Sequence, residues 1–180
     1  MLVGHQQPSW GGGRCAISIL ILVLPLALFA DRPRIIQHDF DDFTVWVDCS
    51  QRGPIAFQYW VRDDIGNLDP TTQTWRLADN VPDECEMTSG NTFTRPSGQP
   101  QYDRGHLVDA NVMDNRSAAI TDTYHRINMA TQARTFNRSG AWRQTEKIVD
   151  CYRDITLLAV WGGIIYGNNS QVNESLRGFA

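Results

Sequence analysis

The segment between residues 102 and 142 constrains the fold more than any other part of the chain. Residues 106–112 have the composition of a strand end that passes into an irregular loop, and residues 124–129 that of a second strand. Residues 139–155 carry apolar side chains at three- and four-residue steps, which is the period of an amphipathic helix capped by Asn137 or Ser139. The local order strand, loop, strand, helix is therefore expected here.

Three further runs are of strand type. Residues 43–47 and 55–61 are rich in aromatic and β-branched side chains and are separated by a turn signal at Gly53 and Pro54. Residues 155–166 read as a buried strand interrupted by Gly162 and Gly163. The polar segment 31–42 is expected to pack loosely, and the proline- and glycine-punctuated segment 80–101 is expected to form a long surface loop.

The amino-terminal apolar run is too short to cross a bilayer. It covers residues 16–30, whereas a spanning helix needs about 20 residues. We interpret residues 1–30 as a signal peptide cleaved after Ala30 and residues 31–180 as one domain, secreted or periplasmic, with no stable membrane association once the leader is removed. An uncleaved anchor and a misassigned start are the alternatives.

The net charge of −4 does not suggest a nucleic-acid-binding protein, but the charge is unevenly distributed. Residues 31–90 hold 5 basic and 12 acidic side chains, whereas residues 91–153 hold 9 basic and 6 acidic ones. The local basic excess coincides with the hairpin and helix segment. Nucleic acid therefore remains a candidate partner through a local patch.

Removal of the leader would leave three cysteines, Cys49, Cys85 and Cys151. Cys49 and Cys85 both lie near loops ahead of residue 102, and we expect them to form a disulfide. Three reduced, buried cysteines in a chain that stays inside the cell are the alternative. No Cys-x-x-Cys pair or Cys/His cluster indicates a zinc site.

His106, Arg104 and Asp103 form the first group of candidate site residues. An imidazole titrates near neutral pH, so His106 is the candidate general base that takes a proton from an attacking water. The forked guanidinium of Arg104 suits phosphate oxygens. Asp103 is expected to be structural and to bind backbone amides.

Asn137 and Glu146 form the second group. Mg²⁺ retains several waters and takes few protein ligands, so the amide oxygen of Asn137 is a candidate ligand. Glu146, nine residues later, could order the waters of such an ion. On spacing alone a helix cap is the simpler role for Asn137, and a solvated helix charge is the simpler role for Glu146.

The combined motifs resemble those of the DNA/RNA non-specific endonucleases, the ββα-metal nucleases, over about residues 43–167. The residues that carry the resemblance are Asp103-Arg104-Gly105-His106, Asn128-Met129-Ala130-Thr131-Gln132, Asn137, Gly140-Ala141-Trp142 and Glu146. The resemblance implies an α+β fold, in which a central antiparallel sheet carries a ββα-metal finger, a hairpin plus a helix. It also implies hydrolysis of DNA and RNA to products with 5′-phosphates.

The same resemblance implies a role for each site residue. His106 would be the general base, Asn137 the sole direct protein ligand of a hydrated Mg²⁺, with Mn²⁺ as a substitute, and Glu146 would lie behind the waters of the ion. The substrate phosphates would contact Arg104, Arg62 and Arg138. The partners would be DNA and RNA, and a homodimer is compatible with the family.

The chain departs from the family pattern in three places. Thr131 replaces a proline, one extra residue separates Asn137 from Gly140, and the chain ends sooner after the Gly162-Gly163 strand than relatives do. Two alternatives to an active nuclease therefore stay open. One is an inactive, truncated remnant or a protein that binds nucleic acid without cutting it, and the other is a secreted interaction module held by disulfides.

Asn137-Arg138-Ser139 is also an acceptor pattern for N-glycosylation, and a glycan on the metal ligand would abolish activity. This conflict favours a bacterial setting.

Overall fold

The computed structural model describes residues 34–66, 68–69, 73–87 and 101–166, which belong to one compact unit, Pro33–Ala180. The proposed signal peptide lies outside the described residues. So does most of the expected 80–101 loop, whose described part contains a short 3-10 helix, η3 (Asp83–Cys85). Within the described ranges, no helix combines the length and the apolar character needed to cross a membrane.

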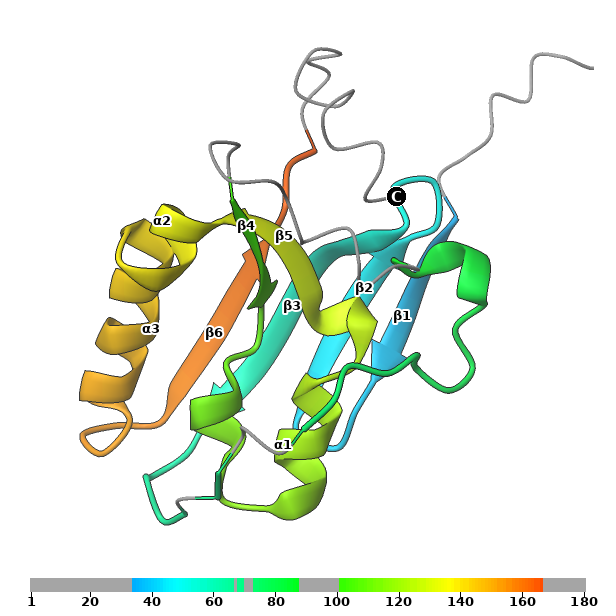
Figure 1. Ribbon diagram of the computed structural model, residues 1–180. Helices are drawn as coiled ribbons and strands as arrows, with labels where there is room; N and C mark the ends of the chain where they lie inside the picture. Colours follow the sequence, from blue (N-terminus) through cyan, green and yellow to red (C-terminus); the bar gives the residue numbers. More distant parts are fainter. Residues whose placement is uncertain (1–33, 67, 70–72, 88–100, 167–180) are drawn as a thin grey trace, which may run out of the picture. The chain divides into compact units, whose positions relative to one another are not determined.

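A four-stranded antiparallel sheet forms the framework (Figure 1). It consists of β1 (Ile35–Asp39), β2 (Phe43–Asp48), β3 (Gly53–Val61) and β6 (Leu158–Gly163), in the order β1-β2-β3-β6. The two strands predicted at residues 43–47 and 55–61 are confirmed. The prediction of a loose 31–42 segment is wrong for residues 35–39, because β1 pairs along its whole length with β2, from Ile35 opposite Asp48 to Asp39 opposite Thr44.

A separate hairpin carries the central motif. Its strands are β4 (Tyr102–His106) and β5 (Met129–Ala133), and His106 pairs with Met129. The prediction of a strand at residues 124–129 is therefore wrong in its position, because β5 begins only at Met129. A 3-10 turn, η6 (Arg126–Asn128), occupies half of that predicted segment. The connection between the two strands also contains η5 (Ala110–Met113) and α1 (Ser117–Thr123).

The helix after the hairpin is divided in two. α2 (Arg134–Arg138) ends at Ser139, whose backbone N–H and hydroxyl both donate to the carbonyl of Thr135, and α3 (Ala141–Tyr152) starts after Gly140. A Cβ at Gly140 would lie 2.8 Å from the Phe136 Cα, so the chain can turn this closely only with glycine. The expected caps are therefore wrong: Asn137 lies inside α2, and Gly140 caps α3.

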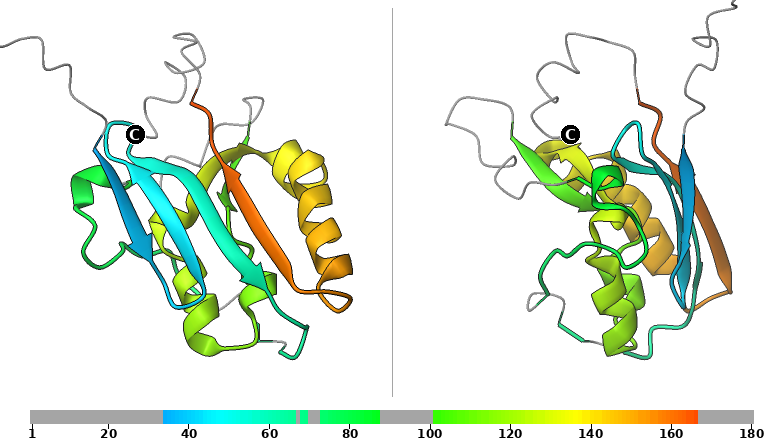
Figure 2. Two further views of the ribbon diagram at one scale, coloured as in Figure 1. Left: turned by 180° about the vertical axis from the view of Figure 1, so that it is seen from behind. Right: turned by 90° about the vertical axis from the view of Figure 1, so that its right-hand side faces the viewer.

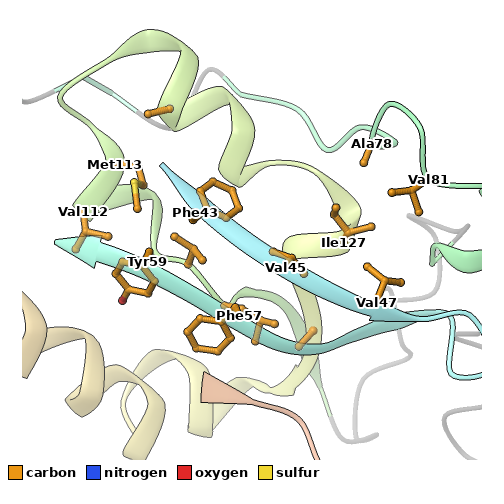
Figure 3. Close-up of a cluster of buried hydrophobic side chains, with 14 of the residues drawn as sticks. Phe43, Val45, Val47, Phe57, Tyr59, Ala78, Val81, Val112, Met113 and Ile127 are labelled. Atoms are coloured by element: carbon orange, nitrogen blue, oxygen red, sulfur yellow. The ribbon is translucent and has the colours of Figure 1, made fainter. Parts of the chain in front are cut away.

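One face of the sheet forms the core (Figures 2 and 3). Alternation along β2 and β3 directs Phe43, Val45, Phe57 and Tyr59 to the same side, where they meet Ile127 of η6. The edge-on view in Figure 2 places the hairpin and the helices on this one side of the sheet. The buried residues of the two layers make one continuous cluster, which fixes the hairpin over β3.

Strand β6 is at the edge of the sheet and is less buried than expected. It pairs only with β3 among the described strands, and Trp161 on its outer face is 67% exposed. The indole of Trp161 donates to Gln58 at 3.0 Å. The prediction of a strand within residues 155–166 is confirmed, but the prediction that it is buried is wrong.

Two long-range connections hold the ends of the framework. A disulfide joins Cys49, just after β2, to Cys85 in η3, which confirms the expected pair and leaves Cys151 as an exposed free thiol. The fully buried Arg153 donates to the carbonyls of Arg62 and Asn111 and so anchors the end of α3.

Candidate active site

The hairpin is shaped by one glycine and one asparagine. A Cβ at Gly105 would lie 2.2 Å from the side-chain carbonyl carbon of Gln132, so only glycine leaves room for this buried side chain. The buried Asn128 accepts from the Val108 N–H at 2.9 Å and donates to the carbonyls of Val108 and Thr123. These bonds fix the chain immediately after His106.

His106 occupies the end of β4 and is enclosed by aromatic rings. Its ring centroid lies 4.7 Å from that of Trp75 and 4.7 Å from that of Tyr124. Burial lowers the pKa of His106 to about 4, because the charged imidazolium loses its hydration. Its buried Nε2 has no hydrogen-bond partner within the described part of the chain. The imidazole is therefore neutral at pH 7 and has an atom available to accept a proton.

Asp103, near the start of β4, connects the hairpin to α2 through side-chain hydrogen bonds. Its carboxylate accepts two bonds from Arg138, at 2.6 and 2.8 Å, and a third from Asn137 Nδ2 at 3.2 Å, while Arg134 Nε lies 3.6 Å away. The bonds from Arg138 lower the pKa of Asp103, and the single bond from Asn137 lowers it further. Asp103 has the expected structural role, but it binds side chains and not the expected backbone amides.

These contacts decide the orientation of the Asn137 amide. Because its nitrogen donates to Asp103, its oxygen points away from that carboxylate. Among the described residues, no group of three His, Cys, Asp or Glu side chains could hold a metal ion. A single amide oxygen, directed by a neighbouring carboxylate, instead suits a hard and largely hydrated ion such as Mg²⁺. The donor set therefore fits the ion that the sequence motifs imply.

Glu146 lies on the sheet-facing side of α3. It lines a cavity of about 100 Å³ together with Tyr59 of β3 and Asp109, the residue that caps η5. Arg143 Nη1 donates to Glu146 Oε2 at 2.9 Å. Burial raises the pKa of Glu146, and the charge of Asp109 raises it further, while Arg143 opposes both effects.

The three candidate phosphate-binding arginines differ in their surroundings. Arg104 is exposed on β4, and Arg62 is exposed just after β3. Arg138 is also exposed, but its guanidinium is engaged by Asp103. Arg138 can therefore reach a phosphate only by giving up these two bonds.

The structure joins some of the candidate residues and not others. Within the described residues, hydrogen bonds join Asn137 and Arg138 through Asp103, whereas no hydrogen bond or ion pair joins His106 to Asn137 or Glu146. Sequence reasoning also missed Trp75, which covers His106, and the partners of Glu146. Arg143 was detectable from its i, i+3 spacing to Glu146, whereas Trp75 gave no such signal.

Comparisons with known proteins give the same assignment as the motifs. The solved structure of the EndoG/EndoGI complex, which addresses the mechanism of EndoG inhibition, matches with a TM-score of 0.59 and 24% identity, over 73% of this chain and 54% of that chain. This match shows the fold alone, and the chain spans about half of the length of that neighbour. No curated protein matches. The model of the DNA/RNA non-specific endonuclease family matches residues 34–178, and the chain belongs to this family.

Proposed function

We propose that the chain is a Mg²⁺-dependent, sequence-non-specific endonuclease that hydrolyses DNA and RNA and leaves 5′-phosphates. The single observation that carries the proposal is the bond between Asn137 Nδ2 and Asp103, in a chain that belongs to a nuclease family. This bond makes the Asn137 amide oxygen available to an ion, beside a hairpin that also carries Arg104 and His106. Mn²⁺ is expected to replace Mg²⁺ because both ions prefer oxygen ligands.

Asn137 and Glu146 would hold the ion and its waters. The amide oxygen of Asn137 is the direct ligand, and the carboxylate of Glu146 accepts hydrogen bonds from the hydration shell. Bound Mg²⁺ supplies stabilisation of the negative charge that develops on the phosphate. Asp103 keeps the amide in the required orientation.

His106 would act as the general base. Nε2 of the neutral imidazole takes a proton from water as the water oxygen bonds to phosphorus. The bond from phosphorus to the 3′ oxygen breaks, and the 3′ oxygen takes a proton from solvent water to become a hydroxyl. The phosphate stays on the 5′ oxygen, which gives the proposed product. Because no described contact joins His106 to Asn137, the phosphate would have to lie between them.

Arg104, Arg62 and Arg138 would bind phosphates of either strand. Contacts to the backbone carry no sequence information, which accounts for cleavage of both DNA and RNA. They also make binding depend on salt. A homodimer stays a prediction, and sedimentation of the purified chain would measure it.

The test uses the full chain with supercoiled plasmid DNA and a single-stranded RNA. Cleavage of both is expected with Mg²⁺, and it should stop with a chelator and return when Mg²⁺ is added in excess. If the products carry 5′-phosphates, a polynucleotide kinase should add a radioactive phosphate to the new 5′ ends only after a phosphatase has removed the existing ones. Activity that persists in the chelator, or in His106→Ala, would contradict the proposal.

A protein that binds nucleic acid without cutting it is the second candidate. The observation in its favour is the enclosure of His106 by Trp75 and Tyr124. Under this alternative, the wild-type chain retards DNA on a gel at low salt and releases it intact after long incubation with Mg²⁺. A wild-type chain that cuts DNA rules it out.

We also propose a secreted or periplasmic location. The disulfide between Cys49 and Cys85 supports it, because such bonds persist mainly in oxidising compartments. Fractionation of the producing cells tests the location, and intact mass under non-reducing conditions tests the bond. A reduced, cytoplasmic protein would contradict this proposal.

A further inference from the structure

The sheet-facing side of α3 does more than pack against the core. Trp142, Thr145, Glu146 and Val149 recur at helical steps and line the cavity between α3 and strands β3 and β6. Three of these side chains are ordinary for such an interface, but Glu146 is a carboxylate whose side chain is only 15% exposed. A buried carboxylate needs a partner to remain charged.

Arg143 is the charged partner that the structure provides, and the Trp142 side chain also lowers the pKa of Glu146. The Nη1 atom of Arg143 donates to Glu146 Oε2 at 2.9 Å from the preceding turn of α3. Arg143 itself lies in an acidic setting, because the charges of Glu146, Asp109 and Asp150 all raise its pKa. The guanidinium therefore stays charged and is surrounded by carboxylates.

Asp109 works against this pair. It lines the same cavity as Glu146, and burial raises the pKa of its own carboxyl group. The charges of Asp109 and Glu146 both raise the pKa of Tyr59, which places all three groups at one location. Without a cation, two carboxylates in this partly enclosed volume would repel each other, and one of them would bind a proton.

We propose that Arg143 is a positioning residue that keeps the Glu146 carboxylate charged and fixed in direction against the repulsion of Asp109. The inference rests on the proposed function, in which charged Glu146 accepts hydrogen bonds from the waters of the ion. Arg143 acts only through Glu146 and need not touch substrate. An ordinary exposed i, i+3 pair would contribute little, but here the acid is largely covered and lines a cavity with Tyr59 and Trp142.

The groups that face Glu146 come from every element around it. β3 contributes Tyr59, the segment after β4 contributes Asp109, and α3 contributes Arg143, on which Asp150 also acts. The residues of β6 in the cavity wall, Val160, Trp161 and Gly162, carry no titratable side chain. Arg143 is thus the cation that the described residues direct at Glu146.

The first experiment measures Glu146 without any activity assay. The full chain is labelled at the side-chain carboxyl of glutamate, and the Glu146 signal, assigned with Glu146→Gln, is titrated by NMR. The pKa of Glu146 should rise in Arg143→Gln and should stay near the wild-type value in Arg143→Lys. The matched control is Lys147→Gln, which removes one exposed positive charge from the next position of α3. An unchanged pKa of Glu146 in Arg143→Gln overturns the proposal.

The second experiment measures the ion. The Mg²⁺ concentration at half-maximal cleavage should rise roughly tenfold in Arg143→Gln, which is the effect of losing one hydrogen bond to a charged group. Arg143→Lys should recover most of this loss, and adding Asp109→Asn to Arg143→Gln should recover part of it. A rise that Arg143→Lys leaves uncorrected contradicts the proposal. A wild-type chain without cleavage refutes the proposed function instead, while the titration still decides whether Arg143 keeps Glu146 charged.

Discussion

The carboxylate of Asp103 accepts two hydrogen bonds from the guanidinium of Arg138, at 2.6 and 2.8 Å. The same carboxylate accepts a hydrogen bond from the amide nitrogen of Asn137. One side chain of the hairpin therefore binds two residues of the following helix, α2. Arg138 and Ser139 stand where the family pattern has a single residue between Asn137 and Gly140. The longer connection leaves the bond between Asp103 and Asn137 in place, and Arg138 adds a second partner to Asp103.

Replacing Asp103 should weaken metal binding more than it weakens the fold. In Asp103→Ala the Asn137 amide loses the bond that orients it, and we expect roughly ten- to hundredfold weaker binding of Mn²⁺, the usual effect of losing a residue that supports a metal ligand. Binding can be followed by electron paramagnetic resonance. Arg138→Gln is the control, because it keeps the bond between Asp103 and Asn137. Equal losses in the two variants would show that Asp103 does not act through Asn137.

Uncovering His106 should return its pKa toward 6.5. Trp75→Ala removes one of the two rings on the imidazole, and restored hydration favours the charged form. NMR titration of the His106 ring measures the change, which should be upward from about 4. Trp161→Ala is the control, since it removes an exposed indole that makes no described contact with His106. A pKa of His106 that stays near 4 in Trp75→Ala would show that Tyr124 and the other surroundings of the imidazole, and not Trp75, exclude water.

Most of the framework could be predicted from the sequence because its signals are local. β2 and β3 follow from aromatic and β-branched alternation, and α3 follows from its apolar period. β1 was missed because its sequence, Ile-Ile-Gln-His-Asp, has few apolar residues and forms a strand only through pairing with β2. β5 was misplaced because the turn η6 consumes residues whose composition favours a strand.

The candidate site was predictable in its residue types but not in its contacts. His106, Asn137 and Glu146 were identified from motifs, whereas the three hydrogen bonds of Asn128 come from the folded chain. Asn137, which binds Asp103, is 34 residues away in the sequence. Their bond depends on the direction in which α2 leaves the hairpin. The division between α2 and α3 depends on the close approach at Gly140, which no periodicity reveals.

Glu86→Gln should stabilise the protein at high pH. Burial raises the pKa of Glu86 to about 7 from 4.5, so between these values the folded chain holds a proton that the unfolded chain has lost. The free energy of unfolding of the wild type therefore falls as the pH rises through this window, whereas that of Glu86→Gln does not. At pH 8 the variant should be more stable by on the order of 2 kcal/mol, and at pH 4.5 the difference should be small.

Thermal unfolding between pH 4.5 and 8 measures this effect. Glu84→Gln is the control, because it makes the same substitution two positions earlier, at an exposed glutamate that pairs with the exposed Arg34. The difference from the wild type should depend on pH more strongly for Glu86→Gln than for Glu84→Gln. A constant difference for Glu86→Gln would mean that Glu86 has an ordinary pKa in the folded state.

Removing the disulfide should destabilise the protein without changing its active-site chemistry. Cys49 and Cys85 are separated by 36 residues, and opening a loop of this length raises the entropy of the unfolded chain. The chain-entropy relation gives a loss of about 4 kcal/mol for the double variant Cys49→Ser with Cys85→Ser. Chemical denaturation measures this loss, and Cys151→Ser, which removes only the exposed free thiol, is the control. Because Val81, just before η3, and Val47 of β2 belong to the same buried cluster, the variant should keep its metal affinity at low temperature. A double variant as stable as Cys151→Ser would show that this packing alone holds η3 against the sheet.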